Sequence, residues 1–154
     1  MSDLNVESEE EDNGTPKIDP ASYFEEGTFN DWIGLTVEEF GDGNVVLSVT
    51  CDEFKQNPSG ILHGGVTATL IDVAGGMAIG SSLGEGPQLK ATTNLNVNYL
   101  RPITNTAYAT GEVVRIGRSN AVSRVEVEST APNGERKTVA IGTATYQRFS
   151  ENPK

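Results

Sequence analysis

The pattern of apolar and polar positions predicts two short strands and then one buried helix. Two runs with alternating or β-branched apolar residues, 32–40 and 44–50, flank the turn Gly41-Asp42-Gly43, which is typical of a hairpin. From Leu62 to Leu83 apolar residues recur at helical spacing, and the remaining sides carry Ala and Gly where charges would normally be. A helix that is apolar almost all round is a buried one.

After Pro87 the chain returns to a strand pattern. Four further strands are predicted, separated by turn residues: 89–100, 108–115, 121–131 and 136–149. This order indicates an α+β domain, in which an antiparallel sheet of five to six strands wraps around one central helix. A sheet curled around a single buried helix is the hotdog arrangement. Such sheets often pair edge to edge in dimers, which also covers exposed strand edges.

The N-terminal segment differs in character from the rest of the chain. Residues 1–20 are polar and acidic with two prolines, so we expect a disordered tail. Residues 20–30 could form a short helix anchored by Phe24 and Phe29. One domain is expected over residues 21–150.

The net charge of −11 lies mostly in the tail, because residues 1–26 hold nine acids and one base. A chain this acidic is not expected to bind nucleic acid through its phosphates. A solubilising tail or adaptation to a high-salt cytoplasm would each explain the acidity. We find no stretch of about 20 apolar residues and no targeting pattern, which favours a cytoplasmic location without membrane insertion.

The predicted helix contains a single carboxylate. Between Lys55 and Glu85 the only ionisable side chains are His63 and Asp72. Because a buried charge without a partner is strongly disfavoured, Asp72 either reaches solvent or a backbone amide, or acts as a base or nucleophile at a site beside the helix. Such a role would make it the catalytic carboxylate of the chain.

The start of the same helix offers donors for a developing negative charge. Gly64 and Gly65 place unpaired backbone amides at a helix N-terminus, although the two glycines could simply form a tight turn. His63 and Asp72 are nine residues apart, about 14 Å along a helix and on opposite sides of it. Asp72 is therefore expected to act across a dimer interface, at the partner subunit's Gly64.

Two stretches of the sequence resemble the hotdog acyl-CoA thioesterases of the phenylacetate-pathway type. The resemblance covers about residues 30–148 and lies mainly in the spacing of an Asn, a His-Gly-Gly and an Asp. The matching segments are Asn57-Pro58-Ser59-Gly60-Ile61-Leu62-His63-Gly64-Gly65, continuing to Asp72, and the strand Thr92-Thr93-Asn94-Leu95-Asn96-Val97-Asn98-Tyr99-Leu100-Arg101-Pro102.

The resemblance implies a role for each matching position. Gly64 would donate its N–H to the thioester carbonyl, helped by the side chain of Asn57. Asp72 of the opposing subunit would activate water or attack the carbonyl directly. Thr92 would orient that water, although strand alternation places it on the polar face unless the strand twists at its start. His63 would position groups near the thiolate, or only pack and hydrogen-bond at the helix start.

Coenzyme A carries anionic phosphates, and the sequence offers few bases to bind them. Arg101 at a strand end and Arg118 with Ser119 in a turn are the candidates, beside Gly65 at the helix start, although solvated turn arginines are common. No phosphate-binding Gly-rich loop is present, and one His with one Cys cannot form a zinc site. No cofactor is expected beyond coenzyme A as part of the substrate.

The leading hypothesis is acyl-CoA hydrolysis by a homodimer or a dimer of dimers. One alternative is a hotdog domain that binds acyl-CoA without hydrolysing it, as a sensor or scaffold. A hydratase or dehydratase is a second alternative. It requires an Asp and a His that converge on one acyl chain, and the nine-residue spacing of His63 and Asp72 does not resemble the motif of those enzymes. The acyl group and the choice between base and nucleophile for Asp72 stay open.

Overall fold

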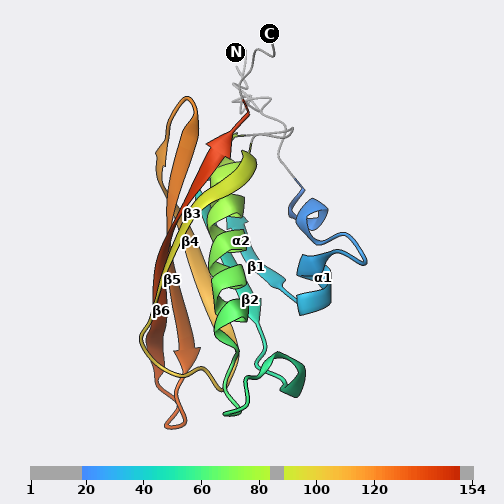
Figure 1. Ribbon diagram of the computed structural model, residues 1–154, viewed down its shortest axis with the longest axis vertical. Helices are drawn as coiled ribbons and strands as arrows, with labels where there is room; N and C mark the ends of the chain where they lie inside the picture. The colour runs from blue at the N-terminus through green and yellow to red at the C-terminus, as the bar shows by residue number, and fades with distance from the viewer. Residues whose placement is uncertain (1–18, 84–88, 150–154) are drawn as a thin grey trace, which may run out of the picture.

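The computed structural model describes residues 19–83 and 89–149, which form one antiparallel sheet and a long helix packed on it (Figure 1). Of the predicted acidic tail, residues 1–20, the first 18 residues lie outside the described residues, and Asp19 caps a 3-10 turn that begins at Pro20. The sheet has six strands in the order β1-β2-β4-β5-β6-β3, so β1 and β3 are its edges. The elements are β1 (Thr36–Gly41), β2 (Asn44–Val49), α2 (Gly64–Leu83), β3 (Leu89–Tyr99), β4 (Ala107–Ile116), β5 (Asn120–Thr130) and β6 (Arg136–Arg148).

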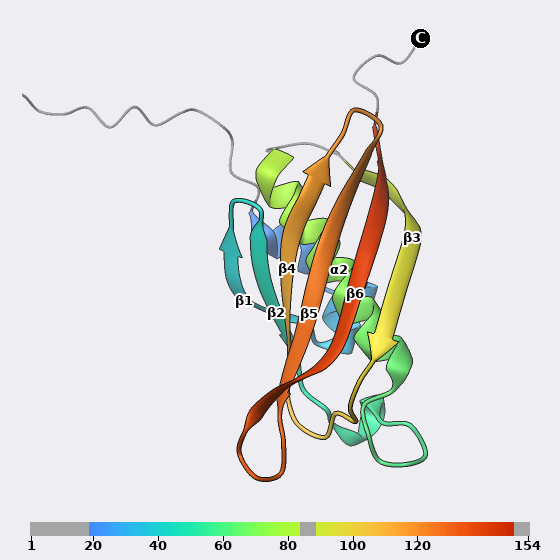
Figure 2. The same cartoon turned by 90° about the vertical axis from the view of Figure 1, so that its left-hand side faces the viewer.

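The predicted fold class is confirmed, and the sequence pattern explains why. Buried and more exposed positions alternate along β5, so one face of that strand packs on the helix and the other faces outward. Figure 2 shows the outer face of the sheet, with α2 crossing behind the strands. The helix, apolar almost all round, packs on the inner face, with Leu70, Ile71 and Met77 completely buried.

The segment before the first strand differs from the prediction. Trp32 does not begin a strand but lies in a short helix, α1 (Phe29–Ile33), with 63% of its surface exposed. Gly34 ends this helix in the left-handed conformation, which interrupts the alternation that suggested a strand. Phe24, in the preceding 3-10 turn (Pro20–Phe24), packs against the core, whereas Phe29 is 57% exposed and is not an anchor.

Helix α2 lies unusually close to the sheet because glycines stand at the contact points. A Cβ added to Gly111 of β4 would lie 2.5 Å from the carbonyl oxygen of Ala74, and one added to Gly142 of β6 would lie 2.9 Å from Ile71. A Cβ added to Gly75 of the helix would lie 2.3 Å from the hydroxyl oxygen of Ser123. These positions tolerate no larger residue unless the helix moves. By length and composition α2 could also cross a membrane, but it is the core helix, and core helices pass the same test.

We predict that Gly111→Ala lowers the free energy of unfolding by about 1–3 kcal/mol, because the added methyl group meets helix backbone that has no room to yield. Urea denaturation followed by circular dichroism would measure the change. Gly41→Ala is the matched control, since the nearest atom to its Cβ is 3.8 Å away and its φ angle is not positive. Equal stability losses in the two variants would contradict the proposed close contact.

Candidate active site

The start of α2 presents one free backbone donor. His63 precedes the helix, and its Nδ1 accepts a hydrogen bond from the N–H of Gly65 at 2.9 Å. This contact requires Nδ1 to be unprotonated, so His63 acts as a side-chain cap of the helix. Within the described residues no hydrogen bond is recorded for the N–H of Gly64, which has no partner inside the helix. Of the two glycine amides, that of Gly64 remains available to a ligand.

Tyr99, at the end of β3, fixes the position of Gly64. Its hydroxyl donates to the carbonyl oxygen of Gly64 at 2.7 Å. A Cβ on Gly64 would lie 3.3–3.4 Å from the hydroxyl and ring of Tyr99, so a side chain there would crowd the tyrosine. The sequence did not identify this contact. The strand alternation placed Tyr99 on the apolar face, but no pattern specified its hydroxyl partner.

Asn57 lies in the loop before α2, and the two polar atoms of its side chain have different roles. Its Oδ1 accepts hydrogen bonds from the backbone N–H groups of Ser59, at 2.9 Å, and Ile61, at 3.3 Å. These bonds close the loop and fix the amide plane. The Nδ2 group then remains as a donor. Asn57, Gly64, Gly65 and Arg101 line one open pocket, so four of the predicted residues do meet there.

The loop that carries Asn57 is held at its base by Lys55. The ammonium of Lys55 is buried and binds Asp52 Oδ2 at 2.6 Å and the carbonyl of Thr50 at 3.2 Å. The side-chain hydrogen bond from Lys55 lowers the pKa of Asp52. The carbonyl of Lys55 in turn accepts the N–H of His63 at 2.8 Å. The two ends of the loop, 55 and 63, are therefore tied together.

Asp72 lies two turns further along α2, partly buried on the flank that faces β3. The hydroxyl of Thr92 donates to its Oδ1 at 2.8 Å. Within residues 19–83 and 89–149, no ion pair involves this carboxylate. Among these residues Thr92 is the only one whose hydroxyl binds a carboxylate oxygen of Asp72 with hydrogen-bond geometry, and it engages Oδ1.

A β-bulge explains how Thr92 reaches Asp72 although simple alternation predicted otherwise. In the β3–β6 ladder Thr92 pairs with Tyr146, and the next pair is Asn94 with Thr145, so one residue of β3 has no partner. The extra residue reverses the alternation and turns Thr92 to the helix side of the sheet. A twist at the strand start was the expected device, and a bulge takes its place.

The Asp72 and Gly64 ends of α2 do not form one site within a chain. They are eight positions apart, about 12 Å along the helix axis. Strand β3 runs beside the helix in the opposite direction, so Thr92 lies near Asp72 and Tyr99 near Gly64 (Figure 2). The chain therefore presents two half-sites along one edge.

The candidate phosphate-binding residues lie at opposite ends of the sheet. Arg101 follows β3 beside the Gly64 half-site, and its Nη1 donates to the carbonyl of Thr138. Arg118 and Ser119 form the turn between β4 and β5, where the carbonyl of Ser119 accepts the N–H of Arg148 at 2.9 Å. Because Arg148 pairs with Leu89, this turn lies beyond the Asp72 half-site. The two arginines cannot reach one ligand within one chain.

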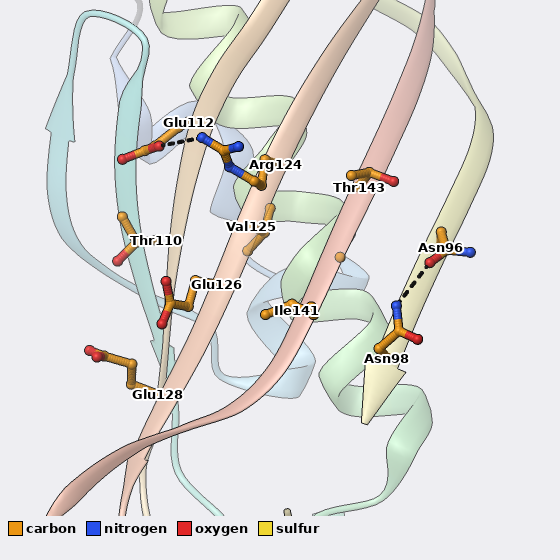
Figure 3. A pocket seen from close by; sticks show the side chains of 11 residues that line it. Asn96, Asn98, Thr110, Glu112, Arg124, Val125, Glu126, Glu128, Ile141 and Thr143 are labelled. Carbon is orange, nitrogen blue, oxygen red and sulfur yellow. Dashed lines mark hydrogen bonds and ion pairs between the residues drawn. The ribbon is translucent and has the colours of Figure 1, made fainter. Parts of the chain in front are cut away.

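A second hollow lies on the outer face of the sheet, away from α2 (Figure 3). It contains the pair Glu112–Arg124, separated by 3.6 Å, and the hydrogen bond from Asn98 to Asn96 at 3.2 Å. None of the predicted site residues lines it. In the described part of the chain no group of His, Cys, Asp and Glu suited to a metal ion is found. This pocket is therefore separate from the predicted site residues on α2 and β3.

Known proteins resemble the chain in sequence and in structure. Residues 59–133 match the Thioesterase superfamily. A Halobacterium salinarum protein, provisionally named an esterase, is 34% identical over 137 residues, 85% of this chain and 91% of the relative. The medium/long-chain acyl-CoA thioesterase YigI of Escherichia coli is 33% identical over 138 residues, 77% of this chain and 83% of the relative.

Solved structures of thioesterase-related proteins also resemble the chain. A thioesterase family protein from Silicibacter pomeroyi is 27% identical and superposes with a TM-score of 0.75, over 84% of this chain and 94% of that one. The phenylacetic acid degradation protein PaaI of Thermus thermophilus, in a mutant form, is 28% identical with a TM-score of 0.66, over 79% and 98% of the two chains. With the curated relatives above 30% identity over most of their length, the chain belongs to the thioesterase superfamily of hotdog-fold proteins.

Proposed function

We propose that the protein hydrolyses acyl-CoA thioesters at a site shared by two subunits. The observation that carries the proposal is the pair of half-sites along α2. One holds a carboxylate, Asp72, oriented by Thr92, and the other presents the free N–H of Gly64 beside the Nδ2 of Asn57. A base and an oxyanion-binding pair are what thioester hydrolysis requires.

The chemistry follows from these groups. Asp72 accepts a proton from water as the water oxygen attacks the thioester carbonyl carbon. The N–H of Gly64 and the Nδ2 of Asn57, both from the other subunit, bind the oxygen that becomes negative. The C–S bond then breaks, the acid is released, and the coenzyme A thiolate leaves with the proton that Asp72 had accepted, which restores the carboxylate. His63, whose Nδ1 is occupied as a helix cap, has its other ring N–H for the thiolate.

A second copy of this chain is the proposed source of the missing half-site. Strand β3 is an eleven-residue edge strand that is exposed over most of its length. Its inward-facing Leu95 and Tyr99 are 38% and 57% exposed, which leaves apolar surface uncovered beside α2. Two-fold pairing of β3 with its copy, with the axis near Leu95 and Asn96, sets Thr92 opposite the partner's Tyr99. The Asp72 of each subunit then faces the Gly64 of the other.

The same two-fold arrangement gives the two arginines one target. Arg118 lies beyond Asp72 in one subunit and Arg101 lies beside Gly64 in the other, so they flank a single composite site. Their guanidinium groups suit the phosphates of coenzyme A. YigI is named for medium and long-chain acyl-CoA, and we propose acyl-CoA as the substrate class here on its 33% identity. The length of the acyl chain is a matter for a substrate panel.

We predict that Asp72→Asn lowers kcat for acyl-CoA hydrolysis by about 10²- to 10⁴-fold, because the amide cannot take the proton from water. Release of free thiol, followed with a chromogenic disulfide, measures the rate. The unfolding midpoint and the oligomeric mass should stay unchanged, since Asn still accepts the hydrogen bond from Thr92. A variant that hydrolyses acyl-CoA at the wild-type rate would exclude Asp72 as the base.

Mixing two inactive variants tests the shared site. Gly64→Pro removes the proposed donor N–H at the first helical position, where the proline backbone is tolerated. Its ring would lie against Tyr99, so the variant is used only if its unfolding midpoint stays close to that of the wild type. We predict that Gly64→Pro and Asp72→Asn are each inactive as homodimers. After dissociation and reassociation at equal amounts, about a quarter of the wild-type activity should return. Half of the dimers are then mixed, and one of their two sites is intact. No recovery, with mixed dimers demonstrated by native mass spectrometry, would place both groups in one chain.

Asn57→Asp separates the structural role of Asn57 from its proposed catalytic role. The carboxylate keeps an oxygen for the N–H groups of Ser59 and Ile61 but loses the Nδ2 donor. We expect stability within about 0.5 kcal/mol of wild type and kcat/KM about 10²- to 10³-fold lower. Asn57→Ala, which loses both functions, should also reduce stability. An Asn57→Asp enzyme with full activity would remove Asn57 from the oxyanion-binding pair.

A further inference from the structure

Two hydroxyl groups of neighbouring strands bind the same residue of α2. Thr92 of β3 donates to the carboxylate of Asp72 at 2.8 Å, and Tyr146 of β6 donates to the backbone carbonyl of Asp72 at 2.5 Å. Thr92 and Tyr146 are direct partners in the β3–β6 ladder. One rung of the sheet therefore binds Asp72 at two points, one on its side chain and one on its main chain.

We propose that Tyr146 is a positioning residue for the Asp72 carboxylate and forms a two-point clamp with Thr92. The inference rests on the proposed function, in which Asp72 is the catalytic base. Tyr146 itself touches neither the substrate nor the reacting water. It holds the helix backbone at the depth from which the side chain of Asp72 meets Thr92.

The surroundings of Tyr146 show that α2 makes room for its hydroxyl. The side chain is only 4% exposed, and a Cβ on Gly75 would lie 2.7 Å from its oxygen. The neighbouring Gly76 would place a Cβ 3.4 Å from the ring. Each glycine inside a helix costs roughly 0.5–1 kcal/mol relative to alanine. Gly75 also makes room for the hydroxyl of Ser123, whereas the atoms nearest to a Cβ on Gly76 all belong to Tyr146. The helix thus gives up stability where the phenol approaches it, and a packing role alone would be served by a phenylalanine.

The hydroxyl is also suited to act as a permanent donor. Burial, and then the negative charge of Asp72, raise the pKa of Tyr146 far above its usual value. The phenol therefore keeps its proton throughout the pH range in which a hydrolase works. The Asp72 carbonyl already has the N–H four residues later as a helical partner, so the Tyr146 bond is additional. It ties α2 to β6 at the residue that carries the base.

The consequence of losing this bond should appear in the chemical step. A catalytic group misplaced by 1 Å can cost about 10²-fold in rate, so a smaller shift of Asp72 should cost about 10-fold. We expect Tyr146→Phe to lower kcat about 10-fold with KM changed less than about 2-fold. Thr92→Val should lower kcat as well. The double variant should be no worse than the more damaging single one, because both act on the position of one carboxylate.

The matched control is Tyr108→Phe. Tyr108 lies in β4 between the buried Ala107 and Ala109, so its side chain faces away from α2, and its ring packs under the guanidinium of Arg136 at 4.3 Å. Removal of this hydroxyl should leave kcat and KM unchanged. As a rescue variant, 3-fluorotyrosine at position 146 retains the hydroxyl and should retain kcat. If Tyr146→Phe folds poorly, the fluorotyrosine variant serves as the test instead. A loss of kcat in that folded variant, which keeps the hydroxyl, would overturn the role of the hydroxyl.

The outcomes separate this inference from the proposed function. If Asp72→Asn is inactive but folded Tyr146→Phe keeps the wild-type kcat, the clamp is wrong and the proposed function stands. Strictly additive losses for Tyr146→Phe and Thr92→Val would also overturn the clamp. If Asp72→Asn is fully active, the proposed function fails, and the inference fails with it. Rates are compared per folded dimer, well below the unfolding midpoint, so that lost stability is not counted as lost catalysis.

Discussion

The close packing of α2 against the sheet determines how Asp72 lies relative to the side chains of β3 and β6. Glycines on both surfaces set this distance, with Gly111 facing Ala74 and Gly142 facing Ile71. At this depth the hydroxyls of β3 and β6 reach the helix backbone and the carboxylate of Asp72. A helix held further out would still bury its apolar face, but it would lose those contacts. The same close contact therefore serves the core and the site.

The edge strand β3 connects the two half-sites. It contacts the carboxylate end of α2 through Thr92 and the amide end through Tyr99. Because β3 is also exposed, the β3 strand of a second copy can pair with it. In an antiparallel pair the Thr92 end of one strand lies opposite the Tyr99 end of the other. In the proposed dimer, the exposed strand edge and the separation of the two half-sites are linked. Within each chain, Asp72, the proposed base, and the N–H of Gly64, the proposed oxyanion donor, are about 12 Å apart along the helix axis.

Much of this architecture follows from the sequence, for identifiable reasons. The buried helix was predictable because it has one carboxylate among apolar and small residues, and the strands because turn residues separate alternating runs. Trp32 was wrongly assigned to a strand because the alternating pattern does not reveal the short helix that Gly34 ends in the left-handed conformation. The direction of the Thr92 side chain was not predictable because it depends on a β-bulge, which arises from the pairing of β3 with β6. The partners of the tyrosine hydroxyls depend on the depth of α2, which no single segment encodes.

The half-sites also show how few atoms remain for chemistry once the local structure is satisfied. The sequence places two glycine amides at the helix start, and the structure shows that His63 binds the N–H of Gly65 and leaves that of Gly64. In Asn57, Oδ1 accepts hydrogen bonds from the backbone of its loop, and Nδ2 remains as a donor. Thr92 binds Oδ1 of Asp72 and thereby fixes the orientation of the carboxylate. In each case the bound atom fixes the direction of the atoms beside it, which is the preorganisation that makes a few hydrogen-bonding groups effective catalysts.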